Sequence, residues 1–121
     1  MNIKRINQND VEIAVIETDE VIITDIQSAL DLMATVRYGN ECDRIAIPKS
    51  CVAEDFFVLS TKIAGEILQK FVTYHCKLVI FGDYSHYTSK PLRDFIYESN
   101  TGSHIFFVET EEEAIAKLSN A

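Results

Sequence analysis

The stretch Asp55–His75, DFFVLSTKIAGEILQKFVTYH, is the part of the sequence that decides the fold. Its apolar residues recur every three or four positions, which is the spacing of one face of an α-helix. They form one continuous stripe that consists of Ile63, Ala64, Ile67, Leu68, Phe71 and Val72. Burying this stripe contributes on the order of 10 kcal/mol before the loss of chain entropy is subtracted. We therefore predict an amphipathic helix that begins near Ser60 and packs this stripe on the core.

Outward from this helix, the chain alternates between strand and helix patterns. The predicted elements before it are a strand at Val11–Glu17, a turn at Thr18–Glu20, a second strand at Val21–Thr24 that closes a hairpin, a helix from Thr24 or Asp25 to about Gly39-Asn40, and a strand at Arg44–Ile47. The predicted elements after it are a strand at Lys77–Phe81, a helix from Ser89 to about Gly102, a strand at His104–Val108, and a last helix that follows the capping box Thr110-x-x-Glu113.

The resulting order, β-β-α-β-α-β-α-β-α, predicts a single α/β domain over residues 1–121. Strands that are separated by helices need crossover connections, so the later strands should run parallel to one another. The first two strands are joined by a short turn and should form an antiparallel hairpin at the edge of a mixed, mostly parallel sheet. Whether the helices cover one face of this sheet or both stays open.

The composition narrows the classes of partner. The formal net charge is −8 and the pI is about 4.7, and no cluster of lysines and arginines offsets this acidity. An acidic field repels phosphate backbones and anionic lipids, so we expect no nucleic acid and no membrane as partners. The chain has no apolar run that is long enough to span a membrane and no signal-peptide pattern at its start. These features predict a cytoplasmic protein.

Gly65 is the unusual residue of the predicted helix, because a glycine in mid-helix costs about 1 kcal/mol relative to alanine. With Thr61 and Gln69 it forms a ridge between the apolar face and the polar face. A small residue between hydrogen-bonding groups permits close approach of another backbone, a subunit or a ligand. Close packing within the chain itself is the alternative explanation.

Two polar segments should lie beyond the carboxyl ends of the parallel strands, which is where open α/β sheets bind ligands. They are Lys49–Thr61 and Gly82–Ser89. Ser60 and Thr61 stand at the predicted helix N-terminus, whose free N–H groups favour an anion or a phosphorylated side chain. An ordinary N-cap is the alternative. The predicted binding residues are Ser60, Thr61, Gly65, Gln69, Asp83 and Ser89.

Sequence motifs predict neither a catalytic group nor a cofactor. Asp83, Ser85 and His86 are the residue types of a nucleophilic triad, but residues so close in sequence rarely reach triad geometry, and no G-x-S-x-G elbow is present. The histidines and cysteines lack the paired spacing of metal ligands, and no dinucleotide or P-loop fingerprint occurs. A small-molecule enzyme that uses Asp83, Glu66 and His86 is the rival hypothesis, and it requires a deep pocket at the strand ends.

Nearly the whole chain resembles an uncharacterised bacterial family, the domain of unknown function 4180. The resemblance is carried by DFFVLSTKIAGEILQKF at Asp55–Phe71, ALDLMATVRY at Ala29–Tyr38, SKPLRDFI at Ser89–Ile96, Glu98-Ser99-Asn100-x-Gly102 and FFV at Phe106–Val108. The family's pattern has glycine where this chain has Lys62. The element order is also similar to that of STAS-type domains, the anti-sigma-factor-antagonist architecture. In that family a phosphorylatable serine precedes the helix after the central strand, and Ser60 and Thr61 occupy the similar place.

These observations lead to a non-enzymatic regulatory or binding module of STAS-like fold, with a homodimer as one possible assembly. Its expected partner is a protein or a small ligand that the sequence does not identify. The small-molecule enzyme stays the alternative. A third hypothesis is a structural subunit of a larger complex, in which Tyr84, Tyr87 and Tyr97 are contact aromatics.

Overall fold

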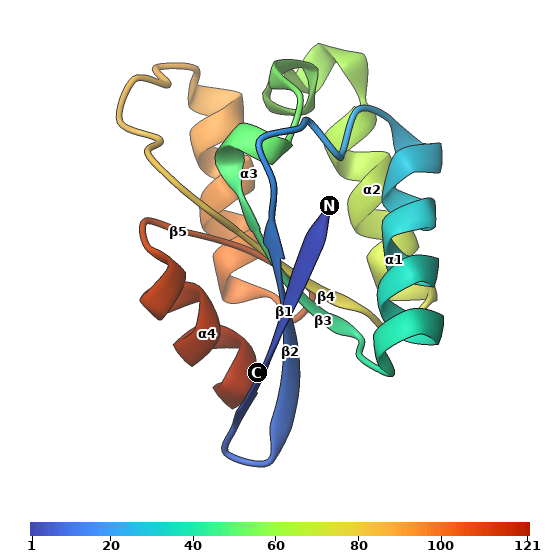
Figure 1. The fold of residues 1–121 in the computed structure, drawn as a ribbon. Coiled ribbons are helices and arrows are strands. Elements are labelled where there is room, and N and C mark those ends of the chain that lie inside the picture. The colour runs from blue at the N-terminus through green and yellow to red at the C-terminus, as the bar shows by residue number, and fades with distance from the viewer.

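A five-stranded sheet organises the molecule, and its strands lie in the same order as in the chain. The computed structural model describes all residues 1–121. The elements are β1 (Asn2–Gln8), β2 (Val11–Glu17), α1 (Ile26–Asn40), β3 (Arg44–Pro48), α2 (Ile63–Thr73), β4 (Lys77–Phe81), α3 (Lys90–Thr101), β5 (Ile105–Val108) and α4 (Glu111–Asn120) (Figure 1). Strands β1 and β2 pair antiparallel, and all later pairs are parallel. This confirms the predicted fold class and element order.

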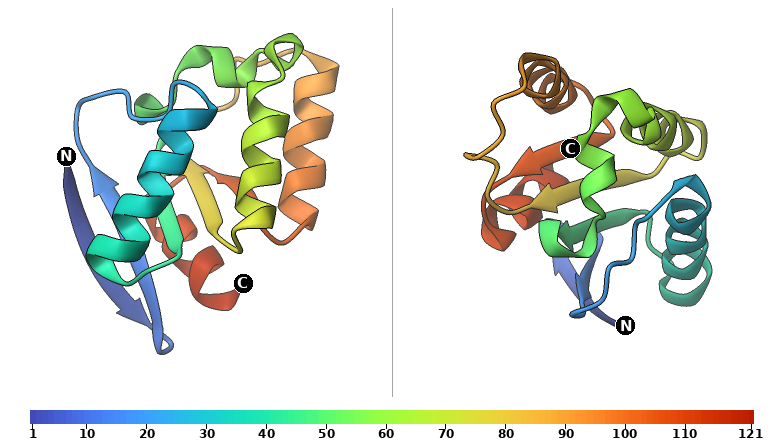
Figure 2. Two further views of the ribbon diagram at one scale, coloured as in Figure 1. Left: turned by 90° about the vertical axis from the view of Figure 1, so that its right-hand side faces the viewer. Right: turned by 90° about the horizontal axis from the view of Figure 1, so that it is seen from above.

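The sheet separates two apolar layers of unequal size. Helices α1, α2 and α3 stand side by side over one face (Figure 2), and the larger core lies beneath them. Alternate residues of the central strands point into this core, for example Ile45, Ile47, Leu78 and Ile80. The residues between them point to the other face, where α4 covers them with Ala114 and Leu118. The helices therefore cover both faces of the sheet, which the sequence had left open: three helices lie on one face, and one helix lies on the other.

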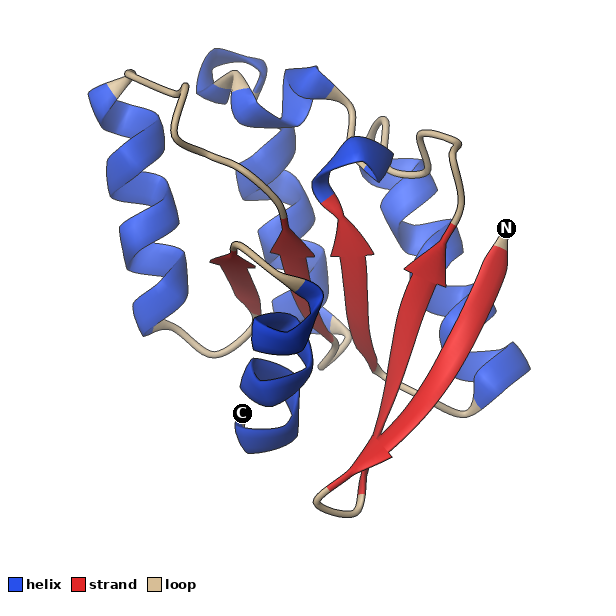
Figure 3. Ribbon diagram, turned by 60° about the vertical axis from the view of Figure 1, so that its left-hand side comes forward, coloured by secondary structure: helices blue, strands red, loops and turns tan.

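The predicted hairpin was placed on the wrong pair of segments. Val11–Glu17 is a strand as expected, but its partner is β1 on its N-terminal side, and the hairpin projects from the sheet at the turn that joins them (Figure 3). Asn9 and Asp10 form this turn with φ angles of 56° and 63°. Two left-handed residues produce the twist that a two-residue hairpin requires, and Asn and Asp tolerate that backbone.

Val21–Thr24 is therefore not a strand of the hairpin. The segment makes one isolated parallel bridge, between Ile23 and Val52, as it crosses the end of the sheet. The physical reason lies in β2, whose residues Ile13–Ile16 are all buried. Such a strand is interior and has neighbours on both sides, and the second neighbour is the parallel strand β3.

The amphipathic helix α2 begins at Ile63 and not near Ser60. Ala64, Ile67 and Phe71 are buried as the stripe predicts, and Ile63 and Leu68 are partly buried. Val72 is 37% exposed, because it lies at the margin of the stripe. None of the helices has the length and the hydrophobicity of a membrane-spanning segment.

Candidate functional site

The carboxyl edge of the sheet, where ligands were expected, is filled by packed aromatic rings. Phe57 lies at the centre of this group. Its ring stacks on Tyr87 with centroids 5.2 Å apart, and it meets the ring of Tyr84 at 6.0 Å and that of Phe107 at 6.4 Å. Contacts of this geometry stabilise beyond the area they bury. The loop after β4 is thereby held on the segment that precedes α2.

Lys49 covers this aromatic group. Its ammonium nitrogen lies 5.1 Å from the ring centroid of Phe57 and 4.9 Å from that of Tyr87, and 3.8 Å from a carboxylate oxygen of Glu54. Its side chain is only 18% exposed. Gly82 is required beneath it, because a Cβ at that position would lie 2.6 Å from the Cβ of Lys49. The Lys49 ammonium group thus makes cation–π contacts with rings of the same chain and stabilises the fold.

The tyrosine hydroxyls at this edge already have partners. Tyr84 donates to the carbonyl oxygen of Ile80 at 2.7 Å, and Tyr87 donates to a carboxylate oxygen of Glu54 at 2.5 Å. Burial raises the pKa of the Tyr84 hydroxyl, and burial together with the Glu54 hydrogen bond raises the pKa of Tyr87. Both hydroxyls are therefore held neutral and act as structural donors.

Topology explains why this edge has no crevice between diverging connections; the hollow beside it, of about 530 Å³, lies between the loop after β4 and α3, with Tyr84, Tyr87 and Tyr97 in its lining. Doubly wound sheets bind ligands where neighbouring connections run to opposite faces. In this chain the parallel strands follow one another in sequence order, so right-handed crossovers place α1, α2 and α3 on the same face. No switch point arises between β2 and β5, and side chains from the loops close over the strand ends.

The predicted residues Asp83 and Ser89 have local roles. A carboxylate oxygen of Asp83 accepts from the backbone N–H of Ser85 at 2.8 Å, and hydrogen bonds from Ser85 lower the pKa of this exposed carboxyl group. Ser89 is the N-cap of α3, and its hydroxyl accepts from the N–H of Leu92 at 3.4 Å. Both side chains stabilise the turn that leads into α3.

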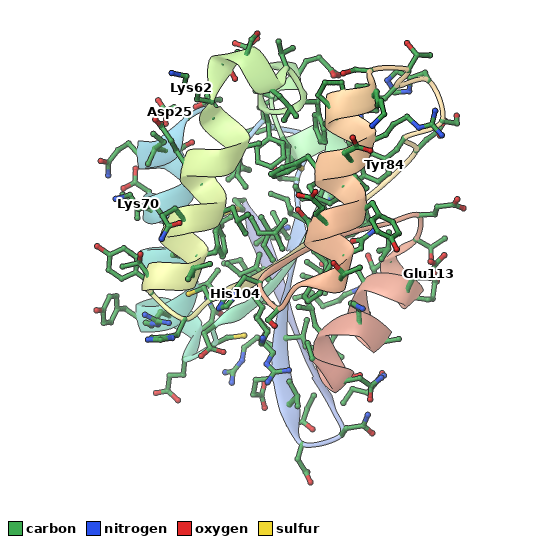
Figure 4. The ribbon with its side chains drawn as sticks, turned by 180° about the vertical axis from the view of Figure 1, so that it is seen from behind. Asp25, Lys62, Lys70, Tyr84, His104 and Glu113 are labelled. Carbon is green, nitrogen blue, oxygen red and sulfur yellow. The ribbon has the colours of Figure 1, made fainter.

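Ser60 and Thr61 lie in a short 3-10 turn (Leu59–Thr61) before α2, and neither is its N-cap. The hydroxyl of Thr61 is within hydrogen-bonding distance of the carbonyl oxygens of Asp55 (2.9 Å) and Val58 (2.8 Å). The N-cap position belongs to Lys62, at the start of α2 in Figure 4. Its φ of 66° is left-handed, a backbone conformation that glycine adopts without the steric cost that other residues meet.

The side-chain hydroxyl of Ser60, unlike that of Thr61, has no hydrogen-bond partner within the chain, and the residue is exposed. Gly65, the third residue of α2, and Gln69, the seventh, are also exposed. Gly65 thus lies in the first turn of the helix and not in mid-helix as the sequence predicted. No atom lies within 4 Å of a Cβ built on Gly65. The explanation of Gly65 by close packing within the chain is therefore wrong, because nothing packs against it.

The three groups of the enzyme hypothesis come from two elements. Hydrogen bonds from Ser85 lower the pKa of the Asp83 carboxyl group, and His86 lies close enough for its charge to add to this effect. Glu66 lies on the exposed face of α2, whereas Asp83 and His86 lie in the loop after β4. No hydrogen bond joins any two of them, and the imidazole of His86 lies against the ring of Tyr87 at 4.1 Å. No three His, Cys, Asp or Glu side chains gather closely enough to hold a metal ion.

Two structural features were missed by sequence reasoning. One is the Lys49–Phe57 contact, which joins residues from separate turns and has no sequence motif. The other is a shallow groove of about 320 Å³ between α1 and the end of α2, lined by Gln27, Leu30, Asp31, Met33, Ala34, Arg37, Tyr38 and Tyr74. The alternation of polar and apolar residues on the outer side of α1 was the available signal for it.

The family model described as Domain of unknown function (DUF4180) matches residues 8–118 of the chain. The chain therefore belongs to this family, and the resemblance to the domain of unknown function 4180 drawn from the sequence is confirmed. No curated protein and no solved structure matches the chain. The family description states no activity, so function has to be argued from the surface of the molecule.

Proposed function

We propose that this chain is a non-enzymatic regulatory or binding module whose partner surface lies on α2 around Gly65. The observation that carries the proposal is the empty space over this glycine. Gly65 is the third residue of α2, so its cost relative to alanine is below the roughly 1 kcal/mol of a glycine in a helix interior, and no contact within the chain compensates for this cost. A partner that approaches the α2 backbone closely would account for it.

The surroundings of Gly65 suit a protein partner. Leu68 and Val72 follow it by three and seven residues and so lie on the same side of the helix. They line a shallow groove of about 280 Å³ between α2 and α3, together with Phe95. Gln69 adds an exposed amide at the edge of this strip. Apolar contacts flanked by a hydrogen-bonding group are typical of interfaces between proteins.

Regulation by phosphorylation belongs to the same proposal, and Ser60 is the residue that suits it. Its hydroxyl is exposed and free, while that of Thr61 is engaged with backbone carbonyls. A phosphate at Ser60 would add about two negative charges one turn before α2 and its surface. The likeness to STAS-type domains is part of this proposal and is supported by the element order. Phosphopeptide mapping in which Ser60 stays unmodified under all growth conditions would exclude this mode of regulation.

The test of the binding surface compares three variants of the tagged chain in affinity purification from native cells. Gly65→Leu places a branched side chain in the path of the partner, so its specific partner should be lost. Gly65→Ala should raise the free energy of unfolding by about 0.4–1 kcal/mol, because the backbone of Gly65 has no positive φ and the site has room for a methyl group. Ala116→Leu on the exposed side of α4 is the matched control and should keep the partner.

Equal recovery of the same proteins with wild type and folded Gly65→Leu would contradict the proposed surface. Destabilisation by Gly65→Ala would instead show that the glycine serves the fold of the chain. Circular dichroism and urea unfolding of each variant separate these outcomes from simple misfolding.

A further inference from the structure

The outer side of α1 carries a projecting aromatic residue beside a groove. Tyr38 is 83% exposed, the highest value among the large hydrophobic residues of the chain. The groove next to it is the one of about 320 Å³ between α1 and Tyr74, and its apolar lining comes from Leu30, Met33 and Ala34. The exposed ring projects from the same face that carries the groove, and both are apolar, so a ring of this kind could fill a groove of this kind.

The sequence of α1 places these features symmetrically about Ala34. Two α1 helices that pack antiparallel across a two-fold axis at Ala34 bring residues three positions before it against residues three positions after it. Asp31 of one copy then faces Arg37 of the other. Leu30, four positions before, faces Tyr38, four positions after. Ala34 faces its own copy, and its small side chain permits close contact of the helices.

The charges are positioned for such a contact. A guanidinium nitrogen of Arg37 donates to the carbonyl oxygen of Tyr74 at 2.7 Å and lies 3.2 Å from the sulfur of Cys76, which holds the side chain at the rim of the groove. Asp31 lies on the exposed side of α1 and accepts only from Gln27, at 2.9 Å. The symmetric arrangement thus pairs opposite charges twice, where a like-charge arrangement would oppose association.

We propose that α1 forms a two-fold interface between two copies of this chain, with each Tyr38 seated in the groove of the other copy. A second copy is the favoured occupant because the projection, the recess and both charges lie on one face, as a self-complementary interface requires. This interface is separate from the partner surface of α2 around Gly65, so one can fail without the other.

Disulfide trapping tests the geometry directly. The native cysteines Cys42, Cys51 and Cys76 are buried, so a cysteine introduced on the surface reports without interference. The Ala34→Cys variant should form a covalent dimer under mild oxidation, because the two Ala34 positions meet at the axis. The Ala116→Cys variant on α4 is the matched control and should stay monomeric. Equal trapping of the two variants would overturn the proposal.

Sedimentation velocity across a range of concentrations tests the contacts. The wild-type chain should show a reversible dimer. Tyr38→Asp should raise the dissociation constant of the dimer by about 100-fold, and Asp31→Arg should raise it by about tenfold. Asp31→Arg combined with Arg37→Asp should recover part of the loss. A wild-type chain that is monomeric throughout, or a dimer that Tyr38→Asp leaves unchanged, would overturn the proposal.

Discussion

The carboxyl edge of the sheet and the outer face of the helices use similar residue types in opposite ways. At the edge, Tyr84 and Tyr87 donate to partners within the chain, and Lys49 lies over aromatic rings. On the outer face, the ring of Tyr38 stands exposed and Gly65 has no neighbour over it. The polar groups at the sheet edge thus have partners within the chain, whereas apolar groups on the outer face of the helices stay exposed to solvent.

This difference teaches that position in a fold does not by itself identify a binding surface. Open α/β sheets bind ligands beyond the carboxyl ends of their strands where neighbouring connections run to opposite faces and open a crevice. In this chain the connections do not diverge, so the loops pack on one another. The unsatisfied surface lies on the helices that cover the opposite side of the core. Four predictions test this contrast.

Removal of Phe57 should have the largest effect. Phe57→Ala deletes the ring that joins Lys49, Tyr84, Tyr87 and Phe107, so the free energy of unfolding should fall by about 3–5 kcal/mol. Tyr97→Ala on the exposed side of α3 should change it by less than about 0.5 kcal/mol. Urea unfolding measures both. Similar losses for the two variants would mean that the edge is not the better packed region.

The two glycines Gly82 and Gly65 should respond to alanine with opposite signs. Gly82→Ala drives a methyl group against the Cβ of Lys49, which cannot swing away, so it should destabilise by about 1–3 kcal/mol. Gly65→Ala meets open space and should stabilise the helix. The midpoints of urea unfolding at constant slope provide the comparison. Destabilisation of both would refute the contrast drawn between the two regions.

Tyr84→Phe should cost about 1 kcal/mol at neutral pH, through loss of the bond to Ile80. The pKa of Tyr84 is raised in the folded chain, so its contribution is fully present below the ordinary tyrosine pKa of about 10 and is lost as the pH rises above it. Wild type should therefore lose stability more steeply than Tyr84→Phe above that pH. Parallel pH profiles would show that the hydroxyl is not buried in the fold.

The smallest expected effect is at the start of α2. Lys62 adopts a left-handed backbone, so Lys62→Gly should stabilise by about 0.5–1 kcal/mol. Lys70→Gly, in the interior of the same helix, should destabilise by about 1 kcal/mol. Thermal unfolding of the pair checks the sign of each change. A loss of stability in both variants would contradict the left-handed cap.

Several structural features followed from local patterns in the sequence. The stripe of α2 predicted Ala64, Ile67 and Phe71 in the core, because helical spacing brings them to one face. Cap residues predicted where three helices begin, namely Thr24 or Asp25, Ser89, and Thr110. The structure selects Asp25 for the first, and each capping side chain bonds to a backbone N–H only three residues away. The alternation of strands and helices then determined the parallel part of the sheet.

What needed the tertiary structure was every feature that joins distant segments. The partner of β2, the left-handed cap at Lys62, the aromatic packing around Phe57 and the open space over Gly65 depend on neighbours that no local pattern specifies. The sequence by itself therefore determined which faces are buried and in what order the elements come, because those depend on spacing along the chain. Only the tertiary structure decided which surfaces stay open, because that depends on what the rest of the chain covers.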